Sequence, residues 1–306
     1  MLKLGANGMA IKPNFLIVGA AKSGTTSLYQ YLRRHPQVFM PDRKEPSYFV
    51  PEAGGIGDWK TYLNLFEAAK GYPRVGEASV SYLMAPEAPG KIAAALGRSV
   101  KIIILLRDPV AMAYSNWGHQ VREGNESASF LDALRDETRR LRDPFFSSES
   151  RTWIYNRTYI ERARYLPQVK RYLDTFGTDN VAVFLFEEFF ASGMPLYAEL
   201  CLYLEIDDSY RPENKAYNRA GTVRSEYVRR VLHERMSWKE PLKRVIPQPV
   251  RRTVMGALAH VNRVERPLPE LPKEAASLIR SALKHDVAGL CELLDRDLFA
   301  TWGFDE

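Results

Sequence analysis

The hydrophobic positions of the chain gather in three short, nearly unbroken runs. These runs are FLIVGA at residues 15–20, VKIIILLRD at residues 100–108 and NVAVFLFEEF at residues 180–189. A β-strand that is covered on both faces shows such a continuous run, because neither of its faces meets water. We therefore expect three strands that are covered on both faces.

Between and after these runs, hydrophobic residues recur with the period of a helix. The expected helices span residues 25–34, 109–123, 157–176 and 272–295. Pro109 suits the first turn of the helix at residues 109–123, and Gly177 suits the end of the helix at residues 157–176. Strands that alternate with helices are typical of α/β proteins. We predict a three-layer, doubly wound parallel sheet within a single domain over residues 1–306.

Residues 211–266 differ in composition from the rest of the chain. They are rich in arginine, lysine and proline and contain far fewer acidic residues. A helical basic insertion, or lid, would have this composition, and so would an ordinary solvated surface. Within the region, residues 250–264 have a basic amphipathic character that suits lipid headgroups, so peripheral contact with a membrane is an open alternative.

The composition is that of an ordinary globular protein. Of the 306 residues, 45% are hydrophobic and 26% are charged, and the formal net charge is +6. This mild excess either keeps the protein soluble or attracts an anionic ligand. No nucleic-acid recognition motif accompanies it, so no nucleic-acid partner is expected. The two cysteines lack disulfide or metal spacing, and neither a secretory signal nor an apolar run of ~20 residues is visible. These features predict a cytoplasmic protein.

The segment FLIVGAAKSGTTSL joins the first predicted strand to the first predicted helix. Gly19 and Gly24 keep the spacing of a phosphate-binding P-loop, but Thr25 stands where the P-loop lysine belongs. The lysine lies earlier, inside the loop, as Lys22. Unpaired amides and the helix dipole at a helix start favour an anion, so the fold is expected to be P-loop-like. The candidate binding residues are Lys22, Ser23, Gly24, Thr25, Thr26 and Ser27.

The motif AKSGTTSL resembles the 5′-phosphosulfate loop of sulfotransferases that use 3′-phosphoadenosine 5′-phosphosulfate as donor. In that family, the lysine at the position of Lys22 reaches the oxygen that bridges phosphate and sulfur. The resemblance implies transfer of a sulfuryl group, with adenosine 3′,5′-bisphosphate as the product. A sulfuryl group carries less charge than a terminal phosphoryl group, so no metal ion is expected to be required.

A second motif, IILLRDPVAMAYSNW, follows another predicted strand. It places Arg107 at the strand end and Ser115 eight residues further on. In the family that the loop resembles, an arginine and a serine at this spacing hold the 3′-phosphate, and the planar guanidinium suits phosphate oxygens. Either Arg219 or Arg266 would complete this contact, and the sequence does not rank the two. Asp108 is best explained as the cap of the following helix.

The segment RKEPSYF resembles the part of glycan sulfotransferases that carries the catalytic glutamate, which here would be Glu45. As the general base, Glu45 would take the proton from the attacking acceptor. The alternative is a surface carboxylate paired with Arg43 or Lys44.

Two further residues are candidates for the site. His119 lies four residues after Ser115, on the same side of the predicted helix, and could serve as base, substrate contact or structural histidine. Glu77, in VGEASVSYL, is expected to position other groups.

The acceptor and the competing functions stay open at this point. Heparan-type sulfotransferases have a lysine where this chain has Ala78, and often a histidine where it has Ser47. A hydroxyl or amine on a glycan or on a small metabolite therefore fits equally well. The main alternative is a P-loop kinase or another ATP-dependent enzyme, which the displaced Lys22 disfavours. The oligomeric state does not follow from the sequence.

Overall fold

The computed structural model describes residues 10–143, 153–191, 195–210, 222–223, 263–264 and 268–305. They fall into two compact units. The first unit comprises Met1–Met112, Ile160–Asn218 and Ile279–Glu306, and the second comprises Ala113–Tyr159 and Arg219–Leu278. The single domain over the whole chain stays a prediction.

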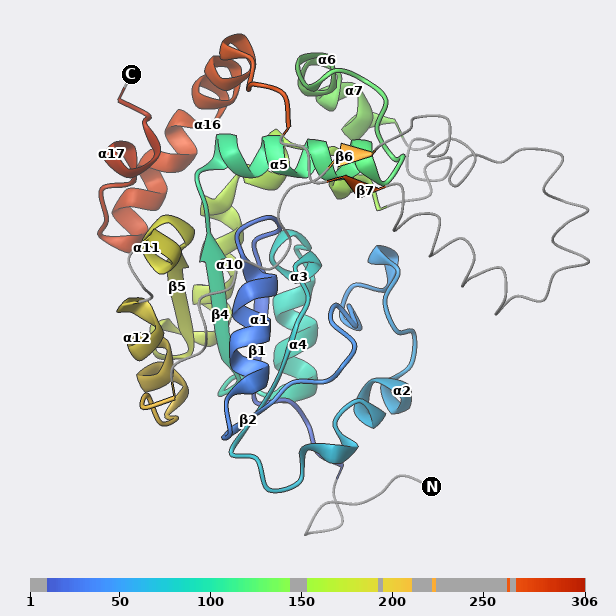
Figure 1. Cartoon of the computed structure of the whole chain (residues 1–306), viewed down its shortest axis with the longest axis vertical. Helices are drawn as coiled ribbons and strands as arrows, with labels where there is room; N and C mark the ends of the chain where they lie inside the picture. The colour runs from blue at the N-terminus through green and yellow to red at the C-terminus, as the bar shows by residue number, and fades with distance from the viewer. Residues whose placement is uncertain are drawn as a thin grey trace, which may run out of the picture. The chain divides into compact units, whose positions relative to one another are not determined.

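The first unit is built on a five-stranded parallel sheet (Figure 1). Its strands are β1 (Phe15–Gly19), β2 (Val38–Phe39), β3 (Arg74–Ala78), β4 (Lys101–Leu106) and β5 (Val181–Leu185). They are ordered β2-β3-β1-β4-β5, so the chain builds first on one side of β1 and then on the other. This is a doubly wound sheet, and such sheets bind ligands at the carboxyl ends of the strands where the winding reverses.

The helices of the first unit are mostly short. They are α1 (Thr25–Arg34), α2 (Trp59–Asn64), α3 (Ser81–Met84), α4 (Ala88–Leu96), α9 (Ile160–Ala163), α10 (Tyr165–Phe176), α11 (Phe186–Ala191), α12 (Pro195–Leu204) and α17 (Leu298–Trp302). Two longer helices, α5 (Pro109–Arg122) and α16 (Lys273–Leu294), each contain one of the four points where the chain passes between the units. The second unit adds α6 (Phe130–Arg135) and α7 (Glu137–Arg142).

Helices cover both faces of the sheet. Ile103 and Leu105 of β4 belong to one buried cluster together with side chains of α1 and α12. Their neighbours Ile102 and Ile104 are also fully buried and point to the opposite face, because side chains alternate along a strand. On that face α3 contacts β1, and α10 contacts β4 and β5. The predicted three-layer α/β fold is therefore confirmed.

The predicted boundaries agree best where the local signals were strongest. The helix at residues 25–34 is observed as α1 with the same limits, and those at residues 109–123 and 272–295 are each shorter by one residue at one or both ends. Such differences are within the usual uncertainty of helix ends.

Two predicted elements are wrong in extent. The strand expected over residues 180–189 ends at Leu185, and α11 begins at Phe186 with two glutamates in its first turn, where negative charge stabilises a helix. The helix expected over residues 157–176 is broken into a 3₁₀ turn, α9 and α10. Pro167 explains the break between α9 and α10, because a proline lacks the N–H and its ring collides with the carbonyl four residues earlier, so it is tolerated only in a first turn.

The predicted lid at residues 211–266 lies almost entirely outside the described residues. Its described parts are β6 (Thr222–Val223) and β7 (Arg263–Val264), which pair antiparallel with Thr222 opposite Val264. The helical character of the region stays a prediction.

Candidate functional site

The predicted anion loop connects β1 to α1, and its backbone is held in an unusual conformation. Lys22 has φ of 61° and Gly24 has φ of 86°, both in the left-handed region. Glycine adopts this region freely, whereas a lysine does so only where its surroundings impose it, as is common at functional sites. A Cβ at Gly24 would lie 2.4 Å from the ring of Phe190, so this position accommodates only glycine.

The start of α1 presents amides and hydroxyls toward the loop. Gly24 is the N-cap residue, and within the described residues no side chain caps this helix and no acidic residue stands in its first turn. The first amides of a helix have no carbonyl partner within the helix, and the dipole makes this end positive. Ser23, Thr25 and Ser27 are buried and Thr26 is half-buried. The local structure therefore has the features that favour an anion at a helix start, and binding of an anion here stays a prediction.

Arg107 joins the end of β4 to this loop. One of its guanidinium nitrogens, Nη1, donates to the backbone carbonyl of Lys22 at 3.1 Å. The guanidinium also lies over the ring of Phe186, 4.6 Å from its centre, which is a cation–π contact. Arg107 at the carboxyl end of β4 is thus bonded to the backbone of the loop that carries Lys22.

Asp108 acts as a helix cap, as expected. Its two carboxylate oxygens accept from the amides of Val110 and Ala111 at 3.0 and 3.2 Å. Burial raises the pKa of Asp108, although these two hydrogen bonds oppose the shift. Its own amide donates to Glu187 at 2.8 Å, which ties α11 to the same strand end.

Glu45 lies in a strained turn beside the end of β3. Its φ is 58°, and its amide donates to the carbonyl of Ala78 at 2.9 Å. Its carboxylate pairs with Lys44 at 2.7 Å and its side chain is 41% exposed. The pairing that the sequence left open is therefore present. It is compatible with a base, because the carboxylate stays accessible.

Arg162 of α9 is a charged neighbour of Glu45 that the sequence did not reveal. Burial lowers the pKa of Arg162 to about 10, and the negative charge of Glu45 acts in the opposite direction. Its helix is distant from the Glu45 motif in the chain and carries no recognisable motif of its own. Only the packing of α9 in the first unit identifies this arginine as part of the electrostatic surroundings of Glu45.

Glu77 is fully buried at the end of β3. Burial raises its pKa to about 7, hydrogen bonds from Ser79 and Tyr62 oppose this shift, and the charge of Glu45 adds to it. The hydroxyl of Ser79 donates to Glu77 Oε2 at 2.8 Å, and that of Tyr62 donates to Oε1 at 3.3 Å. Strongly shifted carboxyl groups often mark functional sites.

Ser115 and His119 lie one turn apart on α5, in the second unit. His119 Nδ1 lies 2.7 Å from Nη2 of Arg122. A guanidinium can only donate, so Nδ1 must accept and a neutral ring carries its proton on Nε2. That arrangement favours a contact or structural role for His119 over a role as base. The convergence of Ser115 with Arg107 stays a prediction.

The remaining predicted phosphate contacts, Arg219 and Arg266, lie outside the described residues. Which of the two arginines contacts the 3′-phosphate therefore stays open.

Comparison with known proteins identifies the family. Residues 12–218, about two thirds of the chain, match the model of the sulfotransferase domain. The chain belongs to this family.

A solved bacterial sulfotransferase supports the assignment over nearly the whole length. The crystal structure of a sulfotransferase from Alicyclobacillus acidocaldarius superposes with a TM-score of 0.71 at 29% sequence identity, covering 95% of this chain and 99% of that one. The shared fold therefore extends beyond the residues that the family model matches.

Curated relatives of this sulfotransferase-domain chain match over shorter stretches. The membrane-associated sulfotransferase kil1 of Dictyostelium discoideum is 33% identical over 36% of this chain and 23% of its own length. The human bifunctional heparan sulfate N-deacetylase/N-sulfotransferase 3 is 37% identical over 35% of this chain and 13% of its own length. The matches thus cover less than a quarter of either relative.

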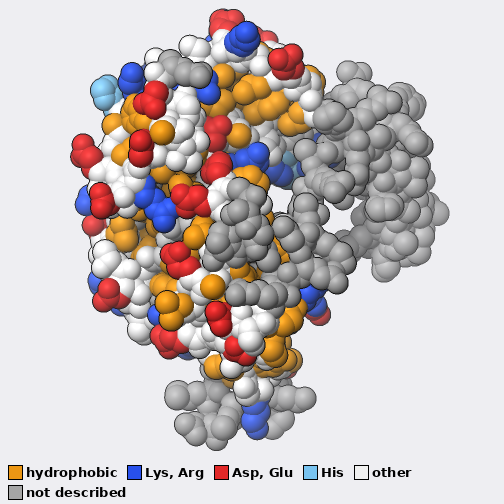
Figure 2. All heavy atoms as spheres, turned by 60° about the vertical axis from the view of Figure 1, so that its left-hand side comes forward, with side chains coloured by type: hydrophobic (Ala, Val, Ile, Leu, Met, Phe, Trp, Pro, Cys, Tyr) orange, Lys and Arg blue, Asp and Glu red, His pale blue; other side chains and the backbone are white. Residues whose placement is uncertain are grey.

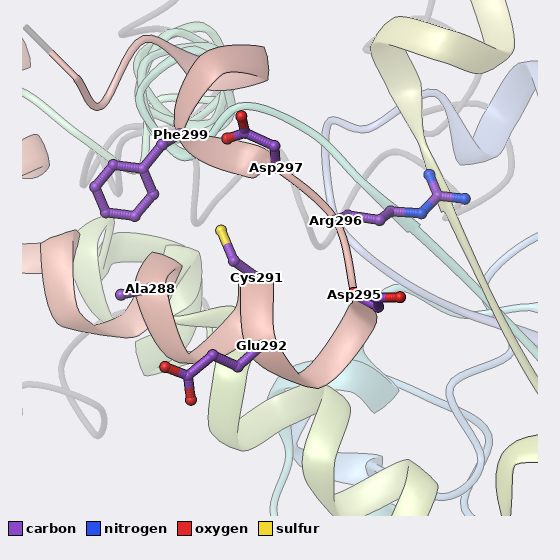
Figure 3. A pocket seen from close by; sticks show the side chains of 7 residues that line it. All are labelled: Ala288, Cys291, Glu292, Asp295, Arg296, Asp297 and Phe299. Carbon is purple, nitrogen blue, oxygen red and sulfur yellow. The ribbon is translucent and has the colours of Figure 1, made fainter.

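Two other observations concern the described residues outside the loop. A pocket of about 540 Å³ lies at the end of α16 and contains none of the predicted site residues (Figure 3). One of its lining residues, Arg296, is paired with Glu188 at 2.7 Å.

Among the described helices, none is both long and apolar enough to cross a membrane.

Proposed function

We propose that this member of the sulfotransferase domain family transfers the sulfuryl group of 3′-phosphoadenosine 5′-phosphosulfate to a hydroxyl or amine. The observation that carries the proposal is the loop itself: Lys22 stands inside it in a left-handed conformation, with Arg107 bonded to its carbonyl. Family membership supports sulfuryl transfer, and the loop supports a donor with an anionic 5′ end.

In the proposed reaction, the bond between sulfur and the bridging oxygen breaks while a bond from the acceptor to sulfur forms in line. The 5′-phosphate leaves with additional negative charge. The ammonium of Lys22 and the amides at the start of α1 would stabilise that charge, and one such donor contributes roughly 3 kcal/mol to an activation barrier. The chain would thereby lower the barrier through electrostatic preorganisation.

Glu45 is the proposed base. Its carboxylate would take the proton of the acceptor hydroxyl or amine as the new bond forms, a role that typically contributes about 10²–10⁴ in rate. Lys44 pairs with this carboxylate, and Arg162 is a second positive charge in its surroundings. Arg107 and Ser115 would hold the 3′-phosphate, with Arg219 or Arg266 as a third contact.

The proposed acceptor is a glycan, with a small hydroxylated or amino-bearing metabolite as the second possibility. Support for a glycan comes from the relatives described above, which include a heparan sulfate N-sulfotransferase. The departures at Ser47 and Ala78 concern residues near Glu45, so the acceptor of this chain need not be heparan sulfate.

A thermal-shift screen distinguishes the proposed donor from that of an ATP-dependent enzyme. We expect adenosine 3′,5′-bisphosphate to raise the melting temperature without added metal, because it carries both phosphate groups that the site would hold. Stabilisation by ATP with Mg²⁺ but not by the bisphosphate would contradict the proposal and favour the kinase alternative. Figure 2 shows a face on which acidic and basic side chains of the described residues are interspersed.

Two variants test the roles of the cations. Lys22→Ala should reduce sulfuryl transfer at least a hundredfold, whereas Lys70→Ala, at an exposed position of the same unit, should leave it unchanged.

Arg107→Ala should weaken binding of adenosine 3′,5′-bisphosphate much more than binding of adenosine 5′-monophosphate in calorimetry. The exposed Arg98→Ala is its control. Equal weakening of both nucleotides would remove Arg107 from the 3′-phosphate.

A further inference from the structure

The turn that carries Glu45 contains two residues in the left-handed region. Glu45 has φ of 58° and Ser47 has φ of 49°, with Pro46 between them. Neither is a glycine, so contacts from outside the turn must hold this conformation. The amide of Glu45 donates to the carbonyl of Ala78, which attaches one side of the turn to β3.

Ser47 is attached to β3 by a chain of hydrogen bonds that ends on Glu77. The amide of Ser47 donates to Ser79 Oγ at 3.0 Å, and the Ser79 hydroxyl donates in turn to Glu77 Oε2 at 2.8 Å. Ser81 adds a contact of 3.2 Å from its hydroxyl to that of Ser47. Ser47, Glu77, Ser79 and Ser81 are all buried. Hydrogen bonds in such a chain polarise one another where water is excluded.

In this series of hydrogen bonds, Glu77 is the only side chain that can carry a full charge. It faces Tyr62 of α2, Tyr82 of α3, Tyr172 of α10 and the carboxylate of Glu45. The aromatic rings around it exclude water: Tyr62 stacks on Tyr48 with centroids 4.8 Å apart. An ionised Glu77 is a stronger acceptor for Ser79 than a protonated one.

We propose that Glu77 is a positioning residue for Glu45, and that it acts through Ser79 on the turn at residues 45–47. The inference rests on the proposed function in one respect, namely that Glu45 is the base. When Glu77 is ionised, Ser79 is held firmly, Ser47 is held by Ser79, and the carboxylate of Glu45 is kept in one place. When Glu77 is protonated, this hold is weakened. Because burial places the pKa of Glu77 at about 7, the change falls near neutral pH.

Hydrogen exchange tests the inference without any donor or acceptor. In the wild-type chain, exchange of the Ser47 amide, corrected for its intrinsic pH dependence, should be about tenfold faster at pH 5.5 than at pH 8.5. Amides of β4 serve as the internal control and should not exchange faster at pH 5.5 than at pH 8.5. An equal change in both segments, or none in Ser47, would overturn the inference.

Variants identify the link through which Glu77 acts. Glu77→Gln and Ser79→Ala should each accelerate exchange of the Ser47 amide about tenfold at pH 8.5, whereas Ser79→Thr, which keeps the hydroxyl, should not. Tyr62→Phe removes one hydrogen-bond donor to Glu77 but leaves the hydrogen bonds from Glu77 through Ser79 to Ser47 intact. It should shift the pH transition upward without abolishing slow exchange at high pH. Unchanged exchange in both Glu77→Gln and Ser79→Ala would overturn the inference.

Turnover provides a second readout. With labelled donor and desulfated heparan sulfate as acceptor, Glu77→Gln should lower kcat about tenfold, leave the KM for the donor within twofold, and flatten the pH profile near 7. A merely structural role would lower stability without removing that pH dependence, and a persisting transition in Glu77→Gln would overturn the inference. Failure of the wild-type chain to bind adenosine 3′,5′-bisphosphate would instead count against the proposed function, because the exchange experiment needs neither donor nor acceptor.

Discussion

Two buried glutamates, one in each unit, show how differently the same side chain behaves in two surroundings. Glu77 of the first unit accepts hydrogen bonds from the neutral hydroxyls of Ser79 and Tyr62. Glu126 of the second unit receives the guanidinium of Arg140 at 2.5 Å and the hydroxyl of Tyr159 at 2.9 Å. Both carboxyl groups are almost completely removed from solvent.

The pKa values of the two glutamates move in opposite directions. Burial dominates at Glu77 and raises its pKa to about 7. Burial also acts on Glu126, but the hydrogen bonds and positive charges of Arg140 and Arg157 outweigh it, so its pKa is lowered. A buried carboxylate with a cationic partner is a permanent structural charge, whereas one with only hydroxyl partners can gain or lose a proton near neutral pH. The comparison assigns a structural role to Glu126 and a titrating role to Glu77.

The largest expected effect comes from breaking the pair in the second unit. Arg140→Ala leaves Glu126 buried without its main partner and should lower the free energy of unfolding by ~3–5 kcal/mol in urea titration. Arg139→Ala is the matched control, because its exposed side chain pairs only with acidic groups at the surface, and it should cost less than about 1 kcal/mol. Similar losses in the two variants would contradict a structural role for the buried pair.

The next effect is a difference in pH dependence. The folded state keeps a proton on Glu77 between pH 4.5, its ordinary pKa, and about 7. The unfolded chain loses that proton, so stability falls as pH rises through this window, by ~3 kcal/mol in total. Glu77→Gln should remove most of this fall when unfolding is measured at pH 5 and pH 8.

The contribution of Glu126 to the free energy of unfolding should depend on pH in the opposite direction in the same experiment. Because its folded pKa is lowered, its contribution is present above its unfolded pKa and is lost as pH falls toward the folded one. Glu126→Gln should therefore destabilise the chain at pH 8 and leave the fall between pH 5 and pH 8 in place. A flattened profile in this variant would refute the assignment of that window to Glu77.

Removing one tyrosine hydroxyl beside each glutamate should produce a smaller contrast. Tyr62→Phe should cost about 1–2 kcal/mol at pH 8 and roughly half as much at pH 5, because hydrogen bonds to an ionised acceptor are about twice as strong. Tyr159→Phe should cost about the same at both pH values, since Glu126 stays ionised. Equal pH behaviour of the two variants in urea unfolding would show that Glu77 does not titrate in this range.

The smallest expected effect is the loss of an exposed ion pair, which serves as the reference for the buried pair of Arg140 and Glu126. Lys170 and Asp174 form an exposed pair one turn apart on α10, at 3.3 Å. Asp174→Ala should change the free energy of unfolding by no more than ~0.5 kcal/mol, because solvent and salt screen such pairs. A loss comparable to that of Arg140→Ala would mean that burial is not what distinguishes the two ion pairs.

Much of the candidate site could be predicted because its signals are local. The hydrophobic run before Gly19, the glycine spacing and the displaced Lys22 all lie within one strand, turn and helix. Arg107 and Asp108 similarly follow directly from a strand end and a helix start. Short elements such as β2 and α3 carry too few residues for a recognisable pattern, and the break in the helix at residues 157–176 depended on one proline.

By itself, the sequence determined the α/β architecture and the placement of Lys22 in the loop after β1 and of Arg107 at the end of β4, because each of these depends on residues close together in the chain. Only the tertiary structure decided which charges face one another. Arg162 becomes a neighbour of Glu45, and Glu77 becomes buried among hydroxyls, because separate helices pack over the end of β3. Desolvation and pairing depend on what packs around a group in space, and residue spacing along the chain does not encode this.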